Sequence, residues 1–293
     1  MSGARTQAGT LLVDIGNTRV KWARLVDGQL GRQHAAAHAG WSSEDFARAL
    51  FGAQRAFTDE RRGSRSVERE RSAAQRLGDV EPIAGAGRDR ILAVSVAGAR
   101  VDSLFTAAAK ARTGLAPELF TSKRTAGGVT TQYVEPWRLG ADRLVGAIGA
   151  HRLARGRPVC VIAVGTALTL DLVDGQGRHR GGAIVPAPDL MKDSLLSKTN
   201  GIRRRAQGGS PAGSFFARST RAAIEQGSRY AAAAVIDRAV AEARKVIGHV
   251  PLVLLTGGGA PALRPLIRSR HRLVPDLVLQ GLAVLASDSA NPS

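Results

Sequence analysis

The sequence predicts an α/β protein built from two similar halves, and three observations support this. Hydrophobic residues make up 44% of the 293 residues, which is enough for a substantial core, whereas aromatic residues make up only 4%. The segment Leu12–Asn17 lines up with Val161–Thr166. Each copy starts a hairpin that ends in Asp-Gly, at Asp27-Gly28 and at Asp174-Gly175. Two copies of a β-β-β-α unit predict two similar domains with a ligand cleft between them.

The first half, which we expect to span residues 1–139, begins with two strands joined by a Gly-Asn turn. Apolar spacing and turn residues then predict an alternation of strands and helices. In order, the predicted elements are strands Thr10–Ile15, Val20–Val26 and Gln33–Ala37, helix Trp41–Phe57 with Ser42 or Ser43 as its cap, strand Ile91–Val96, helix Val101–Arg112 capped near Asp102, and a short strand at Pro117–Phe120. A stretch at about 58–90 is rich in charge and poor in apolar residues, which predicts an insertion or loop.

The second half, expected at residues 140–293, restarts the pattern after a helix. Its predicted elements are helix Ala141–Ala154, strands Val159–Val164, Leu168–Val173 and Gly181–Val185, helices Pro188–Ser197 and Ser219–Ile247, strand Pro251–Leu255 and helix Ala262–Arg270.

Charge, cysteine content and apolar runs bear on which ligands and which cellular compartment are expected for this protein. The formal net charge is +18. A basic balance indicates a nucleic-acid or acidic ligand, or simply an arginine-rich coding bias, and charge alone does not separate these. The single cysteine, Cys160, lies in an apolar strand and is expected to be an inert buried thiol. With no signal pattern and no bilayer-length apolar run, a cytoplasmic protein is expected, without membrane contact.

The first candidate site is Asp14-Ile15-Gly16-Asn17-Thr18, followed by Lys21. Asp14 ends a strand and Gly16 allows close approach of the backbone to a ligand. Turn amides, polar side chains and a lysine can donate to phosphate oxygens, and an aspartate beside them can hold Mg²⁺. An ordinary β-hairpin turn would use the same residue types.

Two further loops can contact a nucleotide. Gly165-Thr166-Ala167 corresponds to the first loop by the internal repeat, with Asp171 on the strand behind it. Thr256–Ala260 is glycine-rich and precedes a helix, where backbone can lie against a purine or sugar. No Lys-Ser/Thr follows these glycines, so the loop is neither a P-loop nor a dinucleotide fingerprint. On their own, the loops are also compatible with simple turns, and Asp171 with an exposed strand residue.

Gly140-Ala141-Asp142-Arg143 stands at a predicted helix start. Asp142 suits a helix cap. Beside a cleft, however, a carboxylate can take a proton from a substrate hydroxyl and an arginine can bind a substrate carboxylate. The histidines His34, His38, His151, His179 and His271 lack convincing metal partners, and no metal site is expected from them.

Five motifs occur in a fixed order: Asp14-x-Gly16-Asn17-Thr18-x-x-Lys21, Tyr133-x-x-Pro136-x-x-Leu139-Gly140-x-Asp142-Arg143, Gly165-Thr166-Ala167-x-Thr169-x-Asp171, Gly181-Gly182-x-Ile184-x-Pro186 and Thr256-Gly257-Gly258-Gly259. Together they resemble type III pantothenate kinases, the group that includes the Bvg accessory factor proteins. The resemblance runs from Leu11 to about Leu263.

This resemblance implies the actin-like fold of acetate and sugar kinases, Hsp70 and actin, with two ribonuclease-H-like domains around a nucleotide cleft. It implies phosphorylation of pantothenate by ATP, with Mg²⁺ and a monovalent cation, K⁺ or NH₄⁺. The product would be 4'-phosphopantothenate, in the first step of coenzyme A biosynthesis. It also implies a homodimer whose partner subunit helps to build the pantothenate pocket.

The same resemblance assigns residues. ATP would bind Asp14, Ile15, Gly16, Asn17, Thr18, Arg19, Val20, Lys21 and Thr166. Pantothenate would bind Tyr133, Gly140, Ala141, Asp142, Arg143 and Thr199. Asp142 would be the catalytic base. The chemistry of the first loop, rather than the resemblance, makes Asp14 the candidate Mg²⁺ ligand.

Two positions depart from the family pattern. The second phosphate loop of the family commonly begins with an aspartate that binds the monovalent cation, and Ala163 stands there in this chain. Alanine has no ligand atom, which puts the cation site in doubt. Glu135 replaces the usual asparagine before Pro136.

Two alternatives remain on sequence alone. A non-catalytic transcriptional accessory factor of the same fold would use the basic stretch Ser194–Ile224, where Phe215-Phe216 is the one candidate for base stacking. No dedicated nucleic-acid site is expected, however. Another actin-like phosphotransferase would share the fold, but the block Tyr133–Arg143 is typical of the pantothenate group.

Overall fold

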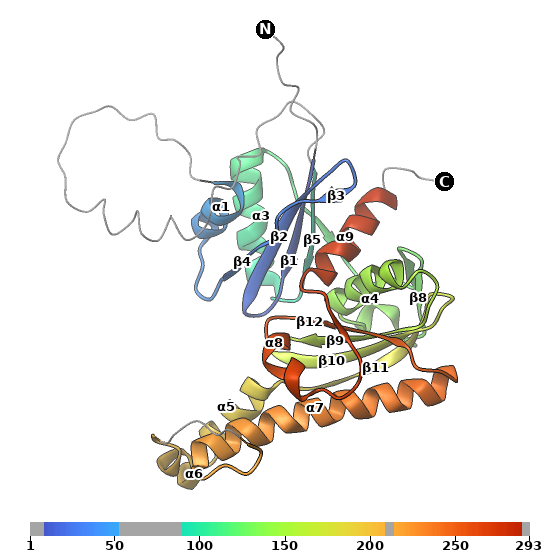
Figure 1. Cartoon of the computed structure of the whole chain (residues 1–293). Coiled ribbons are helices and arrows are strands. Elements are labelled where there is room, and N and C mark those ends of the chain that lie inside the picture. Colours follow the sequence, from blue (N-terminus) through green and yellow to red (C-terminus); the bar gives the residue numbers. More distant parts are fainter. Residues whose placement is uncertain (1–8, 53–89, 209–213, 289–293) are drawn as a thin grey trace, which may run out of the picture. The chain divides into compact units, whose positions relative to one another are not determined.

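The computed structural model describes residues 9–52, 90–208 and 214–288. The chain divides into two compact units, Met1–Phe120 and Thr121–Ser293, and Figure 1 shows the elements of each. The sequence predicted a boundary between Leu139 and Gly140. The segment that begins at Thr121 belongs to the second unit because its strand β8 (Val129–Thr131) pairs with β11 (Arg178–Pro186). Except for Arg90, the predicted insertion at about 58–90 lies outside the described residues.

Unit 1 is a mixed sheet with two helices on one face (Figure 1). Its elements are β1 (Thr10–Ile15), β2 (Arg19–Val26), β3 (Gln29–Leu30), β4 (His34–Ala37), α1 (Ser43–Phe51), β5 (Arg90–Ser95), α3 (Ala99–Thr113) and β6 (Glu118–Phe120). The strand order is β3-β2-β1-β5-β6, and β4 also pairs with β2. Strand β1 runs antiparallel to β2 and parallel to β5.

The core of unit 1 follows from strand alternation. Leu11, Val13 and Ile15 point to the helix-covered face and pack against buried residues of α1 and α3, whereas Asp14 belongs to the opposite face. Ser42 caps α1 in a capping box with Asp45. The predicted cap of α3 was wrong: Gly98 precedes the helix, and Asp102 accepts a hydrogen bond from the Ser95 hydroxyl.

Unit 2 holds the remaining elements. Its strands are β7 (Thr125–Ala126), β8, β9 (Val159–Val164), β10 (Ala167–Val173), β11, β12 (Leu252–Thr256) and β13 (Arg272–Leu273). Its helices are α4 (Ala141–Ala154), α5 (Pro188–Lys198), α6 (Asn200–Arg205), α7 (Thr220–Ile247), α8 (Ala260–Leu263) and α9 (Leu277–Asp288), with 3₁₀ turns η1 (Pro136–Arg138) and η2 (Arg264–Leu266).

The two sheets have the same topology, which confirms the predicted repeat. In unit 2 the order β11-β10-β9-β12-β13 reproduces β3-β2-β1-β5-β6 of unit 1. Each repeat starts with an antiparallel pair and continues with two parallel strands. This is the ribonuclease-H-like arrangement, so the predicted α/β, actin-like fold class is confirmed.

Helices cover both faces of the unit 2 sheet. On one face, Cys160, Ile162 and Val164 of β9 pack against α7. On the other lies α4, which packs tightly against α9 (Figure 1). At this contact a Cβ on Gly149 would lie 2.4 Å from the Leu277 carbonyl oxygen, and a Cβ on Gly281 would lie even closer to the Val145 carbonyl. Glycine is therefore required at both positions.

Unit 2 differs from the sequence prediction in several features, among them α6 and β13, which were not predicted. The expected helix Ala262–Arg270 is replaced by the short α8 and η2; Pro265, inside the expected helix, supplies no helical N–H, whereas Pro261 lies in the first turn of α8, where proline is tolerated. Helix α9 was not predicted. Gly127 and Gly128 both have positive φ and form the two-residue turn of the β7–β8 hairpin, whose two short strands were not predicted.

Candidate active site

The first predicted phosphate loop is the turn between β1 and β2 in unit 1. Asp14 is 7% exposed and stands opposite Lys21, whose Nζ lies 3.7 Å from Asp14 Oδ2. The Gly16 amide donates to the Arg19 carbonyl at 3.0 Å, which closes the turn and leaves Asn17 and Thr18 exposed. The loop thus offers polar groups to a ligand beside the pair formed by the buried Asp14 carboxylate and the partly exposed Lys21.

His38 holds this loop from behind. Its Nε2 donates to the Gly16 carbonyl at 2.6 Å, and its backbone N–H donates to the Thr18 carbonyl at 3.3 Å. The imidazole is buried and packs against the rings of Trp41 and Phe46. His38 is therefore a structural support of the turn.

The donor set of this loop fits Mg²⁺ in the way that kinases use the ion. Mg²⁺ keeps several waters and is usually held by one or two carboxylates together with substrate phosphates. In the described residues, no group of three or more His, Cys, Asp or Glu side chains could form an all-protein metal site. Asp14 supplies one carboxylate, which suits an ion shared with a nucleotide.

In unit 2, two loops meet at the end of β9. Gly165 and Thr166 are exposed at the turn to β10. The Gly259 amide donates to the Val164 carbonyl at 3.0 Å, and a Cβ on Gly257 would lie 2.3 Å from the same oxygen. The glycine-rich loop is thereby pressed against the second predicted phosphate loop.

Asp142 lies in the first turn of α4, after Gly140. Its Oδ1 accepts the Arg143 backbone N–H at 2.8 Å. Burial raises the pKa of the Asp142 carboxyl above its ordinary value; the Arg143 N–H and charge act in the opposite direction, and the Asp171 charge adds to the rise. A carboxylate with a raised pKa is a better proton acceptor, which suits a general base.

Arg143 is anchored by a buried carboxylate. Its Nε donates to Asp171 Oδ2 at 3.0 Å and its Nη2 to Asp171 Oδ1 at 2.6 Å, and its Nη1 donates to the Tyr133 hydroxyl at 3.1 Å. Burial acts to lower the pKa of Arg143, but the bonds and charge of Asp171 outweigh it and raise the pKa. The structure therefore brings Tyr133, Asp142 and Arg143 together.

Glycine in β11 makes room for this pair. A Cβ on Gly182 would lie 2.5 Å from both Arg143 Nη2 and Asp171 Oδ1, and 2.3 Å from the Leu170 carbonyl oxygen. The Gly-Gly motif predicted from sequence thus has a packing cause.

The position of the family cation ligand does not fit a bound cation. Ala163 on β9 stands between Thr169 of β10 and Thr256 of β12. Both neighbours carry hydroxyl groups, but Ala163 places no carboxylate there. These residues do not supply the anionic ligand that the family pattern expects.

Thr199 does not belong to an element that carries Tyr133, Asp142 or Arg143; it lies between α5 and α6. Its hydroxyl donates to the Leu195 carbonyl at 2.6 Å, which ends α5. Within the subunit, the Thr199 hydroxyl is thus engaged in capping a helix.

Sequence reasoning missed three supporting residues. It placed Asp171 in the third motif but gave it no role and left open an exposed strand position, whereas Asp171 is 2% exposed and pairs with Arg143. It set His179 aside among arginines, although His179 Nε2 lies 2.8 Å from Asp171 Oδ1. Arg124, which bonds the carbonyls of Thr131, Tyr133 and Val134, was also not noticed. The signal available for Asp171 and His179 was their place on adjacent strands facing α4.

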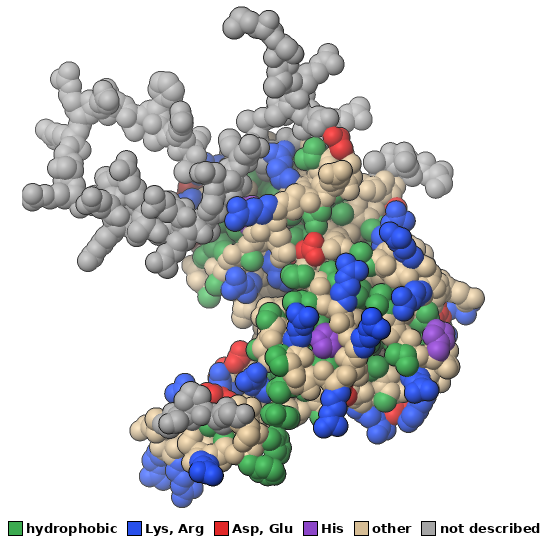
Figure 2. Space-filling view, viewed as in Figure 1, with side chains coloured by type: hydrophobic (Ala, Val, Ile, Leu, Met, Phe, Trp, Pro, Cys, Tyr) green, Lys and Arg blue, Asp and Glu red, His purple; other side chains and the backbone are tan. Residues whose placement is uncertain are grey.

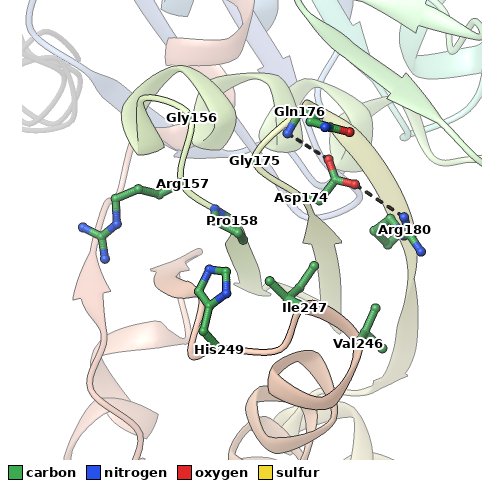
Figure 3. Close-up of a pocket in the computed structure, with 10 residues that line it drawn as sticks. All are labelled: Gly156, Arg157, Pro158, Asp174, Gly175, Gln176, Arg180, Val246, Ile247 and His249. Atoms are coloured by element: carbon green, nitrogen blue, oxygen red, sulfur yellow. Dashed lines mark hydrogen bonds and ion pairs between the residues drawn. The ribbon is translucent and has the colours of Figure 1, made fainter.

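A hollow of about 560 Å³ lies at the far end of the unit 2 sheet (Figure 3). It contains none of the predicted site residues. Its carboxylate, Asp174, accepts the Gln176 and Arg178 amides and pairs with Arg180, so the charge is already neutralised. Register places this hollow beside Val159, at the opposite end of β9 from Gly165.

Comparisons with known proteins agree with these motifs. A family model described as Type III pantothenate kinase matches residues 10–242. A type III pantothenate kinase from Nitrosococcus oceani is 32% identical over 96% of this chain and 94% of its own length. One from Azoarcus sp. is 34% identical over 97% and 92%. The chain belongs to the type III pantothenate kinase family.

Among solved structures, a Baf family transcriptional activator from Campylobacter jejuni has a TM-score of 0.53 at 14% identity, covering 96% of this chain and 99% of its own. That likeness shows the fold alone. The names of the sequence relatives favour a kinase over an accessory factor. Within the described ranges, no helix combines the length and apolar character needed to cross a membrane.

Proposed function

We propose that this type III pantothenate kinase family member transfers the γ-phosphate of ATP to the primary hydroxyl of pantothenate, giving 4'-phosphopantothenate, the first step of coenzyme A biosynthesis. The observation that carries the proposal is the cluster at the start of α4. There a buried carboxylate of raised pKa, Asp142, stands next to an arginine fixed by Asp171 and Tyr133. A cytoplasmic location, expected from the sequence, belongs to the same proposal.

Arg143 has donors left for a substrate. A guanidinium carries five N–H groups, and three of them are used by Asp171 and Tyr133. One N–H on Nη1 and one on Nη2 remain, and they can donate to the carboxylate of pantothenate. Tyr133 accepts from Arg143 and keeps its own hydroxyl proton to donate.

In the proposed mechanism, Asp142 accepts the proton of the pantothenate hydroxyl as that oxygen attacks the γ-phosphorus in line, and the bond from the γ-phosphorus to the β,γ-bridging oxygen breaks so that ADP leaves. Residues Asp14–Lys21 and Thr166 bind the phosphates of ATP, with Lys21 offsetting their charge. Asp14, together with the nucleotide, would hold Mg²⁺, and the ion would supply further neutralisation of charge on the transferring group. No step is assigned to a monovalent cation.

The proposal includes a homodimer. A groove of about 840 Å³ lies among α5, α6 and α7, and its lining is mainly apolar. Ile184, Leu190 and Leu195 are 59%, 43% and 41% exposed nearby. Figure 2 shows hydrophobic side chains gathered beside the α5–α7 end of unit 2, where Lys and Arg also cluster. A second copy is the occupant that would remove this apolar surface from water.

Dimerisation would also give Thr199 its predicted role. Thr199 lies between Leu195 and Ile202, which both line the groove. We propose that Thr199 serves the pantothenate pocket of the partner subunit. Light scattering should give the mass of a dimer, and Leu195→Arg should give a monomer. A monomeric wild-type chain would refute this part of the proposal.

The decisive experiment is phosphate transfer from ATP to pantothenate by the purified chain with Mg²⁺, with and without K⁺ or NH₄⁺. The matched control is Asp142→Asn, which keeps size and hydrogen bonding but removes the base. Product from the wild type alone is expected. Equal turnover by both proteins would refute the role of Asp142, and no product from either would refute the proposed reaction.

A further inference from the structure

A closed circuit of hydrogen bonds begins and ends at Tyr133. The Tyr133 backbone N–H donates to Thr131 Oγ1 at 3.2 Å, and Thr131 Oγ1 lies 3.4 Å from His179 Nδ1. His179 Nε2 lies 2.8 Å from Asp171 Oδ1. Asp171 holds Arg143, whose Nη1 returns to the Tyr133 hydroxyl. The circuit joins β8, β10, β11 and α4.

The direction of each bond follows from donor chemistry. A carboxylate only accepts, so the proton on His179 Nε2 faces Asp171. The Thr131 hydroxyl accepts the Tyr133 amide and is free to donate its proton to His179 Nδ1. His179 thus links the backbone of the Tyr133 loop to the carboxylate that aims Arg143.

We propose that His179 is the positioning residue of the substrate-binding cluster, fixing the guanidinium of Arg143 and the ring of Tyr133 before pantothenate arrives. This inference rests on the proposed function, because it takes Arg143 and Tyr133 as the groups that contact pantothenate. His179 acts through Asp171 and Thr131 and touches neither substrate nor phosphate.

His179 and its two partners in this circuit are buried, so the loss of one hydrogen-bond partner is costly. His179 is 0%, Thr131 1% and Asp171 2% exposed. Water therefore does not replace a lost partner, and an unpaired buried acceptor is costly. The ring of His179 also packs against that of Tyr133, with centroids 5.8 Å apart and a 34° tilt. An apolar replacement would keep that packing but would leave Asp171 Oδ1 with one donor fewer.

Arg124 supports the backbone of the Tyr133 loop independently of His179, so the positioning role of His179 can be tested apart from folding of the loop. It donates to the carbonyls of Thr131 and Tyr133 at 3.0 and 2.7 Å, so the loop backbone has a second support. Loss of His179 should therefore disturb the aim of Arg143 and Tyr133 more than the path of the loop.

The test compares His179→Gln with His179→Leu in the full chain. The Gln amide nitrogen can reach the place of Nε2 and donate to Asp171, whereas Leu fills the space without a donor. For Leu we expect the KM for pantothenate to rise about tenfold, with the KM for ATP changed less than about twofold. Gln should restore most of the pantothenate KM.

The possible results distinguish failure of the proposed function from failure of the inference about His179. A wild-type chain that makes no product refutes the proposed function, and the inference falls with it. An active wild type with an unchanged pantothenate KM in His179→Leu, or with Gln no better than Leu, overturns the inference alone. If thermal unfolding shows that His179→Leu does not fold, Thr131→Val tests the inference in its place. This variant removes the Thr131 hydroxyl at nearly constant side-chain volume. A rise of about threefold in the pantothenate KM is expected, and no rise overturns the inference.

Discussion

The contact between α4 and α9 predicts opposite effects for two glycines on one helix. Alanine at position 149 would place its Cβ 2.4 Å from the Leu277 carbonyl oxygen and 2.8 Å from the Gly281 amide nitrogen. Alanine at position 146 would meet only Val278 Cγ2, at 3.9 Å, an ordinary contact. Both changes are otherwise the same, since each gives α4 a better helix former.

The magnitudes follow from these distances. At Gly149 the obstructing atoms are backbone and do not rotate away, so we place the overpacking cost at the upper end of the usual range, about 3 kcal/mol. The gain in helix propensity returns about 1 kcal/mol, which leaves a loss of about 2 kcal/mol. Gly146→Ala should keep the gain of about 1 kcal/mol. These values correspond to a Tm about 4–8 °C lower and about 2–4 °C higher, respectively.

Differential scanning calorimetry at fixed protein concentration measures both variants against the wild type. Asp142 and Arg143 lie two turns from Gly149, so activity well below Tm should be retained in Gly149→Ala. Equal shifts of Tm in the two variants, or a stabilised Gly149→Ala, would refute the argument that backbone contact requires glycine.

Three further predictions concern the site. Asp142→Asn should abolish turnover while sparing ATP binding. Folding raises the pKa of Asp142, so ionisation of this carboxyl destabilises the folded state as the pH rises from its unfolded pKa through its folded pKa. Asp142→Asn should therefore raise Tm at pH 8 more than at pH 4. A lower Tm of the variant at pH 8 would contradict this. Activity should depend on K⁺ less steeply than in relatives with the aspartate, since Ala163 has no ligand atom, and a strict millimolar requirement would show that other ligands suffice. Gly182→Ala should push Arg143 away from Asp171 and raise the pantothenate KM by at least about tenfold, and an unchanged KM measured by initial rates would refute that packing argument.

The repeated sheet could be predicted from sequence because its signals are local. Apolar runs and Asp-Gly turns mark β1, β2, β9 and β10, and their order in the two halves is the same. Strand and helix bounds such as Ala141–Ala154 agree with the prediction. Helix α9 escaped prediction because its sequence is apolar around most of its surface, and its reason for being helical is the close contact with α4.

The site was predictable in its exposed motifs and not in its buried support. Asp14, Asp142 and Arg143 belong to motifs with characteristic spacing. The role of Asp171 and His179 depends on their contact across β10 and β11. It depends also on Gly182, which leaves room for Arg143 to reach Asp171. Sequence spacing does not show the strand register or the space left by a missing Cβ, so the third motif contained Asp171 without its role, and His179 was set aside.

The lone thiol of this protein has a practical consequence. Cys160 is buried in the sheet, and burial raises its pKa to about 12, so almost no thiolate exists at neutral pH. The wild-type chain should thus be inert toward maleimides while folded. A cysteine introduced at an exposed position, such as Trp137 within the Tyr133–Arg143 motif, would be the one residue labelled. Protection of such a label by pantothenate or ATP would map each ligand footprint without replacing a native residue of the core.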